Sequence, residues 1–148
     1  MRSVTTQSVI VAEKRGTFVD VTEEMQRAIK DSGITDGCVV AYCRHTTCGL
    51  IINEWEDGAH NDVRNHLERL IPPDGYFAHD DLSLRTQNVQ PDERANGWSH
   101  VTQMLLGGSS HSIPVAAGEP LLGKWQRLIF VELDEPKERT LLWHVFGE

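Results

Sequence analysis

The apolar residues of this chain fall into short runs, rich in β-branched side chains, that are bounded by glycine and polar residues. The runs GCVVAYC (37–43), GLIIN (49–53) and RLIFVEL (127–133) have the length and composition of buried strands. No run approaches the roughly 20 apolar residues that a membrane-spanning helix requires. The pattern therefore predicts a β-rich core and no membrane partner.

Other segments have the same strand character. They are 3–12, 17–21, 110–115 and 139–146. We expect 17–21 to pair with 3–12 across the turn at Lys14-Arg15-Gly16, because the two segments follow each other closely.

Two segments carry a helical pattern instead. Thr22 is the expected N-cap and Gly33 the expected C-cap of a helix over 22–33. Apolar residues recur at spacings of three and four over 59–71, with Asp57 as a candidate cap and Pro72-Pro73 as the stop. These features predict two amphipathic helices.

A shorter helix is predicted over 100–108, where the chain reads HVTQMLLGG. The preceding segment, 73–97, is polar and aperiodic, and ordered loops of that length tend to be functional. A chain of 148 residues has the usual size of one domain. The order of elements predicts a single α+β domain over 1–148, in which helices cover part of a largely antiparallel sheet system.

The charge balance and the cysteines limit the partners and the compartment. The chain has 14 Lys plus Arg against 22 Asp plus Glu, a formal net charge of −8, and no basic cluster. Nucleic acid is therefore an unexpected partner. Cys38, Cys43 and Cys48 are odd in number and five apart, which fits neither a secreted disulfide framework nor a zinc knuckle. We expect reduced thiols in a cytoplasmic protein.

Histidines at element ends are the first candidates for chemistry. His45 follows a predicted strand, His79 lies in the long loop, and His100 begins the short helix. Three imidazoles from separate segments can form an open zinc-type site, while the plainer interpretation is polar loop histidines. By contrast, we expect His60 and His66 on solvent-facing helix positions, and the strand residues His111 and His144 to be hydrogen-bonded structural groups.

Carboxylates and a glycine-rich turn are further candidates. Glu54 ends a predicted strand, and Asp80-Asp81 follows His79, so proton transfer, metal binding or orientation of a histidine are open to them. The segment Gly107-Gly108-Ser109-Ser110 fits either an anion-binding nest or a helix C-cap. The nearby basic residues that could neutralise a phosphate are Arg44, Arg85, Lys124 and Arg127. Cys48 fits either a nucleophile activated by His45 or, by default, a buried thiol.

Taken in order, several segments resemble the YjbQ-type family, which is labelled secondary thiamine-phosphate synthase. They are HTTCGLIINE (45–54), YFAHD (76–80), Asn96-Gly97 with His100, LLGGSS (105–110), IPV (113–115) with Gly118, and GKWQ (123–126) with Glu132. The resemblance covers nearly the whole chain. The chain departs from the family pattern at two places. The family commonly has an Asp-Pro pair after Asn-Glu and then a later Asp, whereas this chain has Glu54-Trp55-Glu56-Asp57, so Asp62 matches that later Asp only with a shift of one residue. The second place is Trp98, where many relatives have a small or acidic residue.

The resemblance implies a fold of two packed sheets and a homotrimer with pockets near the subunit boundaries. It implies a pocket lined by His45, Thr46, Glu54, His79 and His100, with Asn96, Ser109, Gly123 and Gln126 near it. The implied reaction joins a pyrimidine-methyl diphosphate to a thiazole phosphate and releases pyrophosphate. We expect His45, Thr46, Glu54 and His100 to act in catalysis, Ser109, Ser110 and Gln126 to bind phosphate, and His45, His79 and His100 to hold a divalent metal such as zinc. Binding of a metal or phosphometabolite without turnover, and metal-dependent hydrolysis, are the alternatives.

Overall fold

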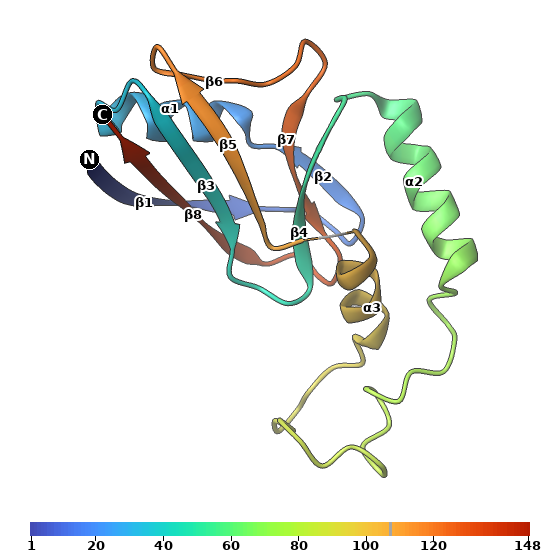
Figure 1. The fold of residues 1–148 in the computed structure, drawn as a ribbon. Coiled ribbons are helices and arrows are strands. Elements are labelled where there is room, and N and C mark those ends of the chain that lie inside the picture. The colour runs from blue at the N-terminus through green and yellow to red at the C-terminus, as the bar shows by residue number, and fades with distance from the viewer. Residues whose placement is uncertain (107) are drawn as a thin grey trace.

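In the computed structural model, which describes residues 1–106 and 108–148, the chain forms two antiparallel sheets and three helices (Figure 1). The five-stranded sheet has the order β1 (Arg2–Val11), β8 (Glu138–Gly147), β3 (Gly37–Cys43), β5 (Ser110–Ala116) and β6 (Glu119–Pro120). The three-stranded sheet has the order β2 (Thr17–Asp20), β7 (Arg127–Glu132) and β4 (Cys48–Asn53). The helices are α1 (Thr22–Ser32), α2 (Asp57–Leu70) and α3 (Gly97–Leu106). The predicted α+β fold with two antiparallel sheets is confirmed.

The three-stranded sheet is buried on both faces, as β7 shows most clearly. Leu128 and Phe130 belong to the main core, which lies between the sheets and against α1. Ile129 and Val131 point the other way, into a second core with Trp98 and the apolar faces of α2 and α3. A strand covered on both faces is apolar at nearly every position, which explains the continuous run in this segment.

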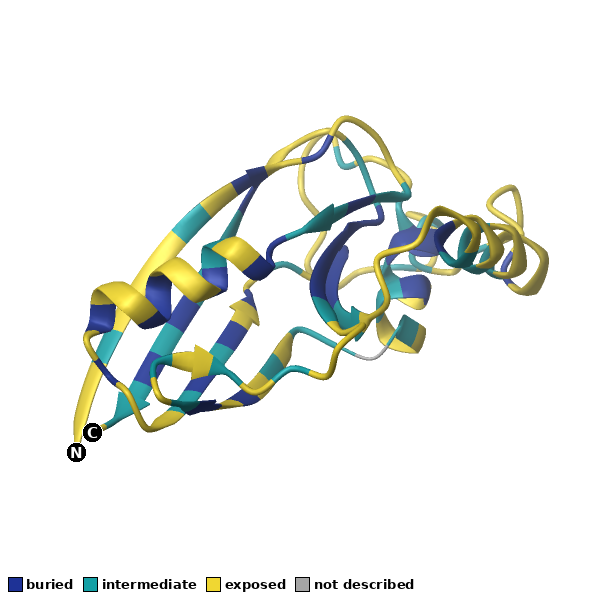
Figure 2. Ribbon diagram, turned by 90° about the horizontal axis from the view of Figure 1, so that it is seen from above, coloured by how far each residue is buried: buried dark blue, intermediate teal, exposed yellow. Residues whose placement is uncertain are grey.

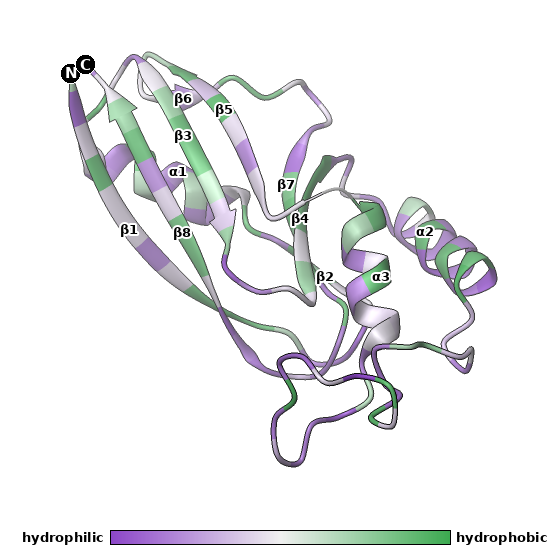
Figure 3. Cartoon of the chain, turned by 60° about the horizontal axis from the view of Figure 1, so that its bottom comes forward, coloured by the Kyte–Doolittle hydropathy of each residue, from purple (hydrophilic) through white to green (hydrophobic). Residues whose placement is uncertain are grey.

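The five-stranded sheet is covered on one face, and its other face is largely uncovered (Figure 2). Along β8, Leu141, Trp143 and Val145 are buried, while the intervening residues are half-buried. β3 and β8 are hydrophobic along much of their length (Figure 3), and the strand register places several of their apolar residues on the uncovered face. We call this surface the outer sheet face; its apolar residues include Val9, Val11, Val40, Tyr42, Leu142 and Phe146.

The predicted pairing of 17–21 with 3–12 is wrong. β2 pairs with β7, and β1 pairs with β8 from Arg2↔Gly147 to Val11↔Glu138. Between β1 and β2 the chain passes through Gly16, which has the left-handed φ of 77° and donates its N–H to the carbonyl of Glu132 at 2.7 Å. The turn therefore carries the chain from one sheet to the other and does not close a hairpin.

Both predicted N-caps are displaced by one residue. Thr22 is the first residue of α1, whose N-cap is Val21, and its hydroxyl is buried, where it accepts the N–H of Leu128 at 2.9 Å. The N-cap of α2 is Glu56, and Asp57 is the first helical residue. The predicted C-cap Gly33 is confirmed, with φ 66° in the left-handed region.

The segment between α2 and α3, residues 71–96, contains neither helix nor strand and extends from the body of the molecule (Figure 1). One carboxylate fixes its end to α3. Asp80 Oδ1 accepts the backbone N–H groups of Asn96 and Gly97, both at 2.9 Å. Gly97 is needed there because an added Cβ would lie 2.5 Å from Cβ of Phe77.

Candidate functional site

His45 and Thr46 lie on the turn that joins β3 to β4. His45 Nε2 accepts the backbone N–H of Thr140 at 3.1 Å. The pKa of His45 is lowered by its burial and by the positive charge of Arg139, so the neutral imidazole predominates near neutral pH. Thr46 is exposed beside it. This turn therefore presents a neutral ring and a free hydroxyl.

Beneath the turn lies an ion pair that is closed to solvent. Arg139 Nε and Nη2 donate to the two carboxylate oxygens of Glu132, each at 2.7 Å, and Nη2 also reaches Thr47 Oγ1 at 3.4 Å. Glu132 is fully buried, and its carboxylate raises the pKa of Arg139 further. The sequence feature that indicates this ion pair is Glu132, a lone glutamate inside an apolar strand, because a buried carboxylate requires a partner. The pair supports the turn from below.

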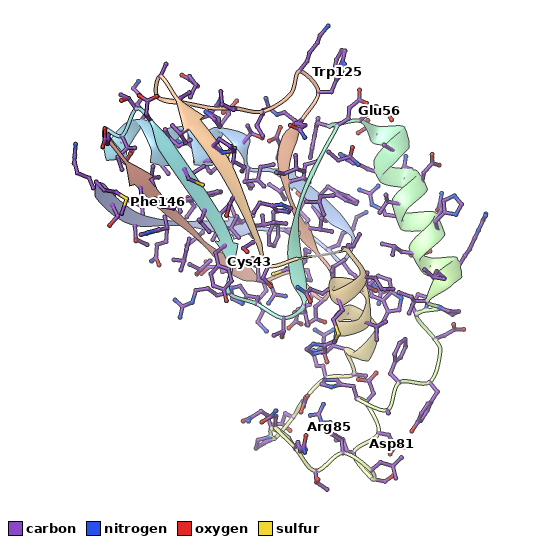
Figure 4. All side chains as sticks on the ribbon, in the orientation of Figure 1. Cys43, Glu56, Asp81, Arg85, Trp125 and Phe146 are labelled. Carbon is purple, nitrogen blue, oxygen red and sulfur yellow. The ribbon has the colours of Figure 1, made fainter. Side chains whose placement is uncertain are left out.

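His79 and His100 come together, as predicted for a shared site. Their ring centroids are 4.4 Å apart, with the planes inclined at 54°. Arg85 Nη1 lies 2.8 Å from His79 Nε2, and Arg85 also pairs with Glu93. Burial and the neighbouring His79 lower the pKa of His100, while the hydrogen bond from Arg85 lowers the pKa of Glu93 to about 2. Arg85, whose place in the loop Figure 4 shows, therefore lies against His79.

A separate hollow of about 220 Å³ lies at the start of α3. Its lining includes Arg15, Phe77, Asp80, Asn96, Trp98 and Asp134. Asn96 Oδ1 is buried there and has no hydrogen-bond partner among the residues that the structure describes. Trp98 lines the hollow and donates its Nε1–H to the carbonyl of Ile71 at 2.6 Å. A small polar ligand with a donor group would satisfy Asn96.

Glu54 and Gln126 lie at the opposite end of the three-stranded sheet. β4 and β7 run antiparallel, from Cys48↔Glu132 to Asn53↔Arg127. The ladder is six residues long, so at about 3.4 Å per residue Glu54 lies roughly 20 Å from the His45 turn. The labelled residues make the same point, because Glu56 and Trp125 lie at one end of the molecule, and Asp81 and Arg85 at the other (Figure 4).

An open hollow of about 320 Å³ lies beside Glu54, and we call it the tryptophan hollow. It is lined by Asp20, Glu54, Trp55, Lys124, Trp125 and Arg127. The two indole rings are 43% and 63% exposed, which is unusual for side chains of this size. Arg127 Nε pairs with Asp20 at 2.7 Å, and the Lys124 ammonium lies 4.7 Å from the Trp125 ring. Aromatic faces and cations therefore meet in one place.

A buried histidine holds Trp55 in position. The His60 ring meets Trp55 edge-on at 4.8 Å between centroids and stacks on Phe18 at 4.5 Å. His60 is only 6% exposed, so its predicted solvent-facing position is wrong. The reason is that α2 packs this side of its first turn against β2. The predicted exposure of His66 is correct.

The predicted phosphate ligands lie at different ends. Ser109 is near the His45 turn, because its carbonyl accepts the N–H of Cys43 at 2.7 Å, and its hydroxyl accepts from Gln103 Nε2 at 3.3 Å. Ser110 is exposed in β5. Gln126 Oε1 accepts the N–H of Gly123 at 2.7 Å, at the other end. Gly107, the first residue of the predicted nest, lies outside the described residues.

Within one chain the three predicted metal ligands do not form a site. Among residues 1–106 and 108–148, no three His, Cys, Asp or Glu side chains lie close enough together to hold a metal. His79 Nε2 also faces the Arg85 guanidinium, whose charge repels a cation. His111 and His144 are hydrogen-bonded strand residues, as predicted, to the Leu50 carbonyl and to Thr5 Oγ1 respectively.

Other predicted residues have plain positions. Asp57 and Asp62 are exposed on α2, and Glu54 is exposed at the end of β4. Cys48 is fully buried, and its pKa is raised by its contact with Cys43 and by burial. These observations favour the structural thiol over the nucleophile. In the part of the chain that the structure describes, no helix has the length and apolarity to cross a bilayer.

Comparison with known proteins gives one consistent result. The model of the family described as UPF0047 protein YjbQ-like matches residues 6–148. A UPF0047 protein of Archaeoglobus fulgidus is 34% identical over 87% of this chain and 90% of its own length. The UPF0047 protein YugU of Bacillus subtilis is 31% identical over 93% and 96%. The crystal structure of a hypothetical protein from Aeropyrum pernix K1 superposes with a TM-score of 0.83 at 30% identity, covering 98% of this chain and 99% of that one.

Proposed function

This chain belongs to the YjbQ-like UPF0047 family, and from that membership we propose that it forms thiamine phosphate. The reaction joins a pyrimidine-methyl diphosphate to a thiazole phosphate: the thiazole nitrogen forms a bond to the methylene carbon, and the bond from that carbon to the pyrophosphate oxygen breaks. Both substrates are flat heteroaromatic rings that carry phosphate. We further propose that the reaction takes place in the cytoplasm.

The observation that carries this proposal is the tryptophan hollow. Two exposed indole rings offer faces on which a heteroaromatic ring stacks. Lys124 supplies positive charge for a phosphate in the same space, and Arg127, which is paired with Asp20, would have to exchange that partner for the phosphate. Glu54 lies at the edge of the hollow, where its carboxylate accepts a hydrogen bond from a ring amino group. A flat, phosphorylated ligand matches this combination better than an apolar one.

We propose a homotrimer in which the two ends of the sheet meet across a subunit boundary. The predicted site residues lie roughly 20 Å apart in one chain, so a pocket that uses all of them needs two subunits. The outer sheet face provides apolar surface for such contacts. The tryptophan hollow of one subunit would then face His79, His100 and Arg85 of its neighbour.

In this arrangement the chain's own groups orient the rings and bind the leaving pyrophosphate. Arg85, Lys124 and Arg127 are the candidate cations, and Thr46, Ser109 and Ser110 are the candidate hydroxyl donors. Stabilising the negative charge of the leaving group is the main requirement, so no covalent nucleophile is needed. His45 and His100, which are neutral near neutral pH, contribute hydrogen bonds or take up a proton.

We propose a zinc-type metal site only at the subunit boundary. His79 and His100 would need His45 of a neighbouring subunit as the third ligand, because the single chain does not assemble the three. Elemental analysis of untagged protein tests this, with about one metal per chain expected and lost in His100→Ala. Protein free of metal with an ordered fold would remove the metal from the proposal.

The test of function is the reaction itself, run with both purified precursors. We expect thiamine phosphate and pyrophosphate in equal amounts, and a rate at least tenfold lower in Trp125→Ala and in His100→Ala. Leu121→Ala is the control, because Leu121 is exposed nearby but does not line the hollow. Binding of a precursor without product would indicate a binding protein, and release of inorganic phosphate from one precursor alone would indicate a hydrolase.

A further inference from the structure

Cys43 and Cys48 face each other at the start of the His45 turn. Their Sγ atoms are 3.2 Å apart, and both residues are buried, at 1% and 0% exposure. Cys43 is the last residue of β3 and Cys48 the first residue of β4. These strands belong to different sheets, so the two sulfur atoms meet where the sheets are joined. Cys43 lies at the end of β3 (Figure 4).

Hydrogen bonds on both sides of the thiols fix this approach. The N–H of Cys43 donates to the Ser109 carbonyl at 2.7 Å. The Thr47 carbonyl accepts the N–H of Leu133 at 3.2 Å, and His45 Nε2 accepts from Thr140. The turn is thus tied to the residue before β5, to the residue after β7 and to β8. The sulfur atoms need to approach by only about 1.2 Å to reach the length of a disulfide bond.

From this geometry we infer that Cys43 and Cys48 form a reversible disulfide when the protein meets a peroxide. The inference is independent of the proposed synthase activity. Cys43, as its thiolate, attacks a peroxide oxygen and the O–O bond breaks; the leaving hydroxide takes up the thiol proton and departs as water, and Cys43 becomes a sulfenic acid. The second sulfur then attacks the sulfenic sulfur, the S–O bond breaks, and a second water leaves. Two thiols are oxidised by two electrons, and one hydrogen peroxide is reduced to two waters.

The disulfide would fasten the two sheets together at the His45 turn. It closes a ring of six residues, 43–48, which contains His45 and Thr46. In the reduced protein the two sheets are held together at this turn by hydrogen bonds and packing alone. A covalent link restricts the unfolded chain and the motion of the turn, so oxidised protein should melt several degrees higher than reduced protein.

Digestion with trypsin can detect the disulfide bond between Cys43 and Cys48. Trypsin cleaves after Arg44, which lies between the two cysteines, so reduced protein yields separate peptides 31–44 and 45–64. The full-length protein is treated with a small excess of hydrogen peroxide, quenched with catalase, unfolded, alkylated and digested. We expect the two peptides to appear joined, and to separate after dithiothreitol. One alkylated cysteine per chain should remain.

Cys38 provides the matched control, because it lies on the same peptide as Cys43 but is half-buried on β3. Cys38→Ser should keep the joined peptides, while Cys43→Ser and Cys48→Ser should each lose them. Three alkylatable thiols after treatment would overturn the inference. So would joined peptides that persist in Cys43→Ser, since the link would then involve Cys38.

Discussion

At the scale of single residues, the buried pair of Glu132 and Arg139 is the contact most sensitive to substitution. Arg139→Met would leave a buried carboxylate without its partner, and we expect a loss of about 3–5 kcal/mol in the free energy of unfolding, measured with guanidinium. A double variant with apolar residues at both positions should recover most of the loss. The matched control is Arg27→Ala, which breaks the exposed Arg27–Glu24 pair and should cost less than about 1 kcal/mol. Equal losses in the two single variants would contradict this assignment.

Residue identity alone revealed which side chains are chemically notable, but it did not reveal which of them meet. The expected proximity of His79 and His100 is confirmed, because His79 lies in the loop that leads into the helix carrying His100. Glu54 was grouped with His45, although the length of β4 separates them. The position of Trp55 in the hollow depends on its contact with buried His60, which the local sequence does not encode.

At the scale of elements, α2 depends on Glu56, whose carboxylate accepts the N–H groups of Gly58 and Ala59, both at 2.7 Å. These hydrogen bonds lower the pKa of Glu56. A lowered pKa means that the ionised group stabilises the fold fully above the unfolded value of about 4.3, and that this contribution is lost as the pH falls from there through the lower pKa of the folded state. Glu56→Gln should therefore lower the melting temperature by a few degrees at pH 7 and much less at pH 3.

The exposed residue Glu68, on the same helix, is the control for that measurement, because Glu68→Gln should leave the melting temperature unchanged at both pH values. A melting temperature for Glu56→Gln equal to the unsubstituted value at pH 7 would show that the cap contributes nothing.

The elements themselves were largely predictable, whereas their pairing was not. The expected cap residues located α1, apolar periodicity located α2, and short apolar runs rich in β-branched residues located the main strands. The partner of β2 was missed, because hairpin pairing is only the commonest outcome for neighbouring strands, and here Gly16 redirects the chain. The two-residue β6 was also missed, because it carries no periodic signal.

At the scale of the whole molecule, the outer sheet face should decide the assembly. A charge placed within apolar contacts is costly unless it is paired, so Phe146→Asp and Val40→Asp should shift the protein from trimer to monomer in light scattering at micromolar concentration. Leu70→Asp is the control, because Leu70 is exposed on α2, away from this face. A trimer that persists in both outer-face variants would place the interface elsewhere, and monomeric unsubstituted protein would refute the assembly.

The pairing of β1 with β8 also bears on how the chain is made. The two strands align along their whole length, from Arg2↔Gly147 to Val11↔Glu138. A ribosome adds about 5–20 residues per second, so β1 waits for roughly ten seconds before its partner is synthesised. During that interval its edge is open and prone to pair with strands of other nascent chains. Only the arrival of β8 closes the gap between β1 and β3, so folding of the larger sheet is expected to be delayed until β8 has been synthesised.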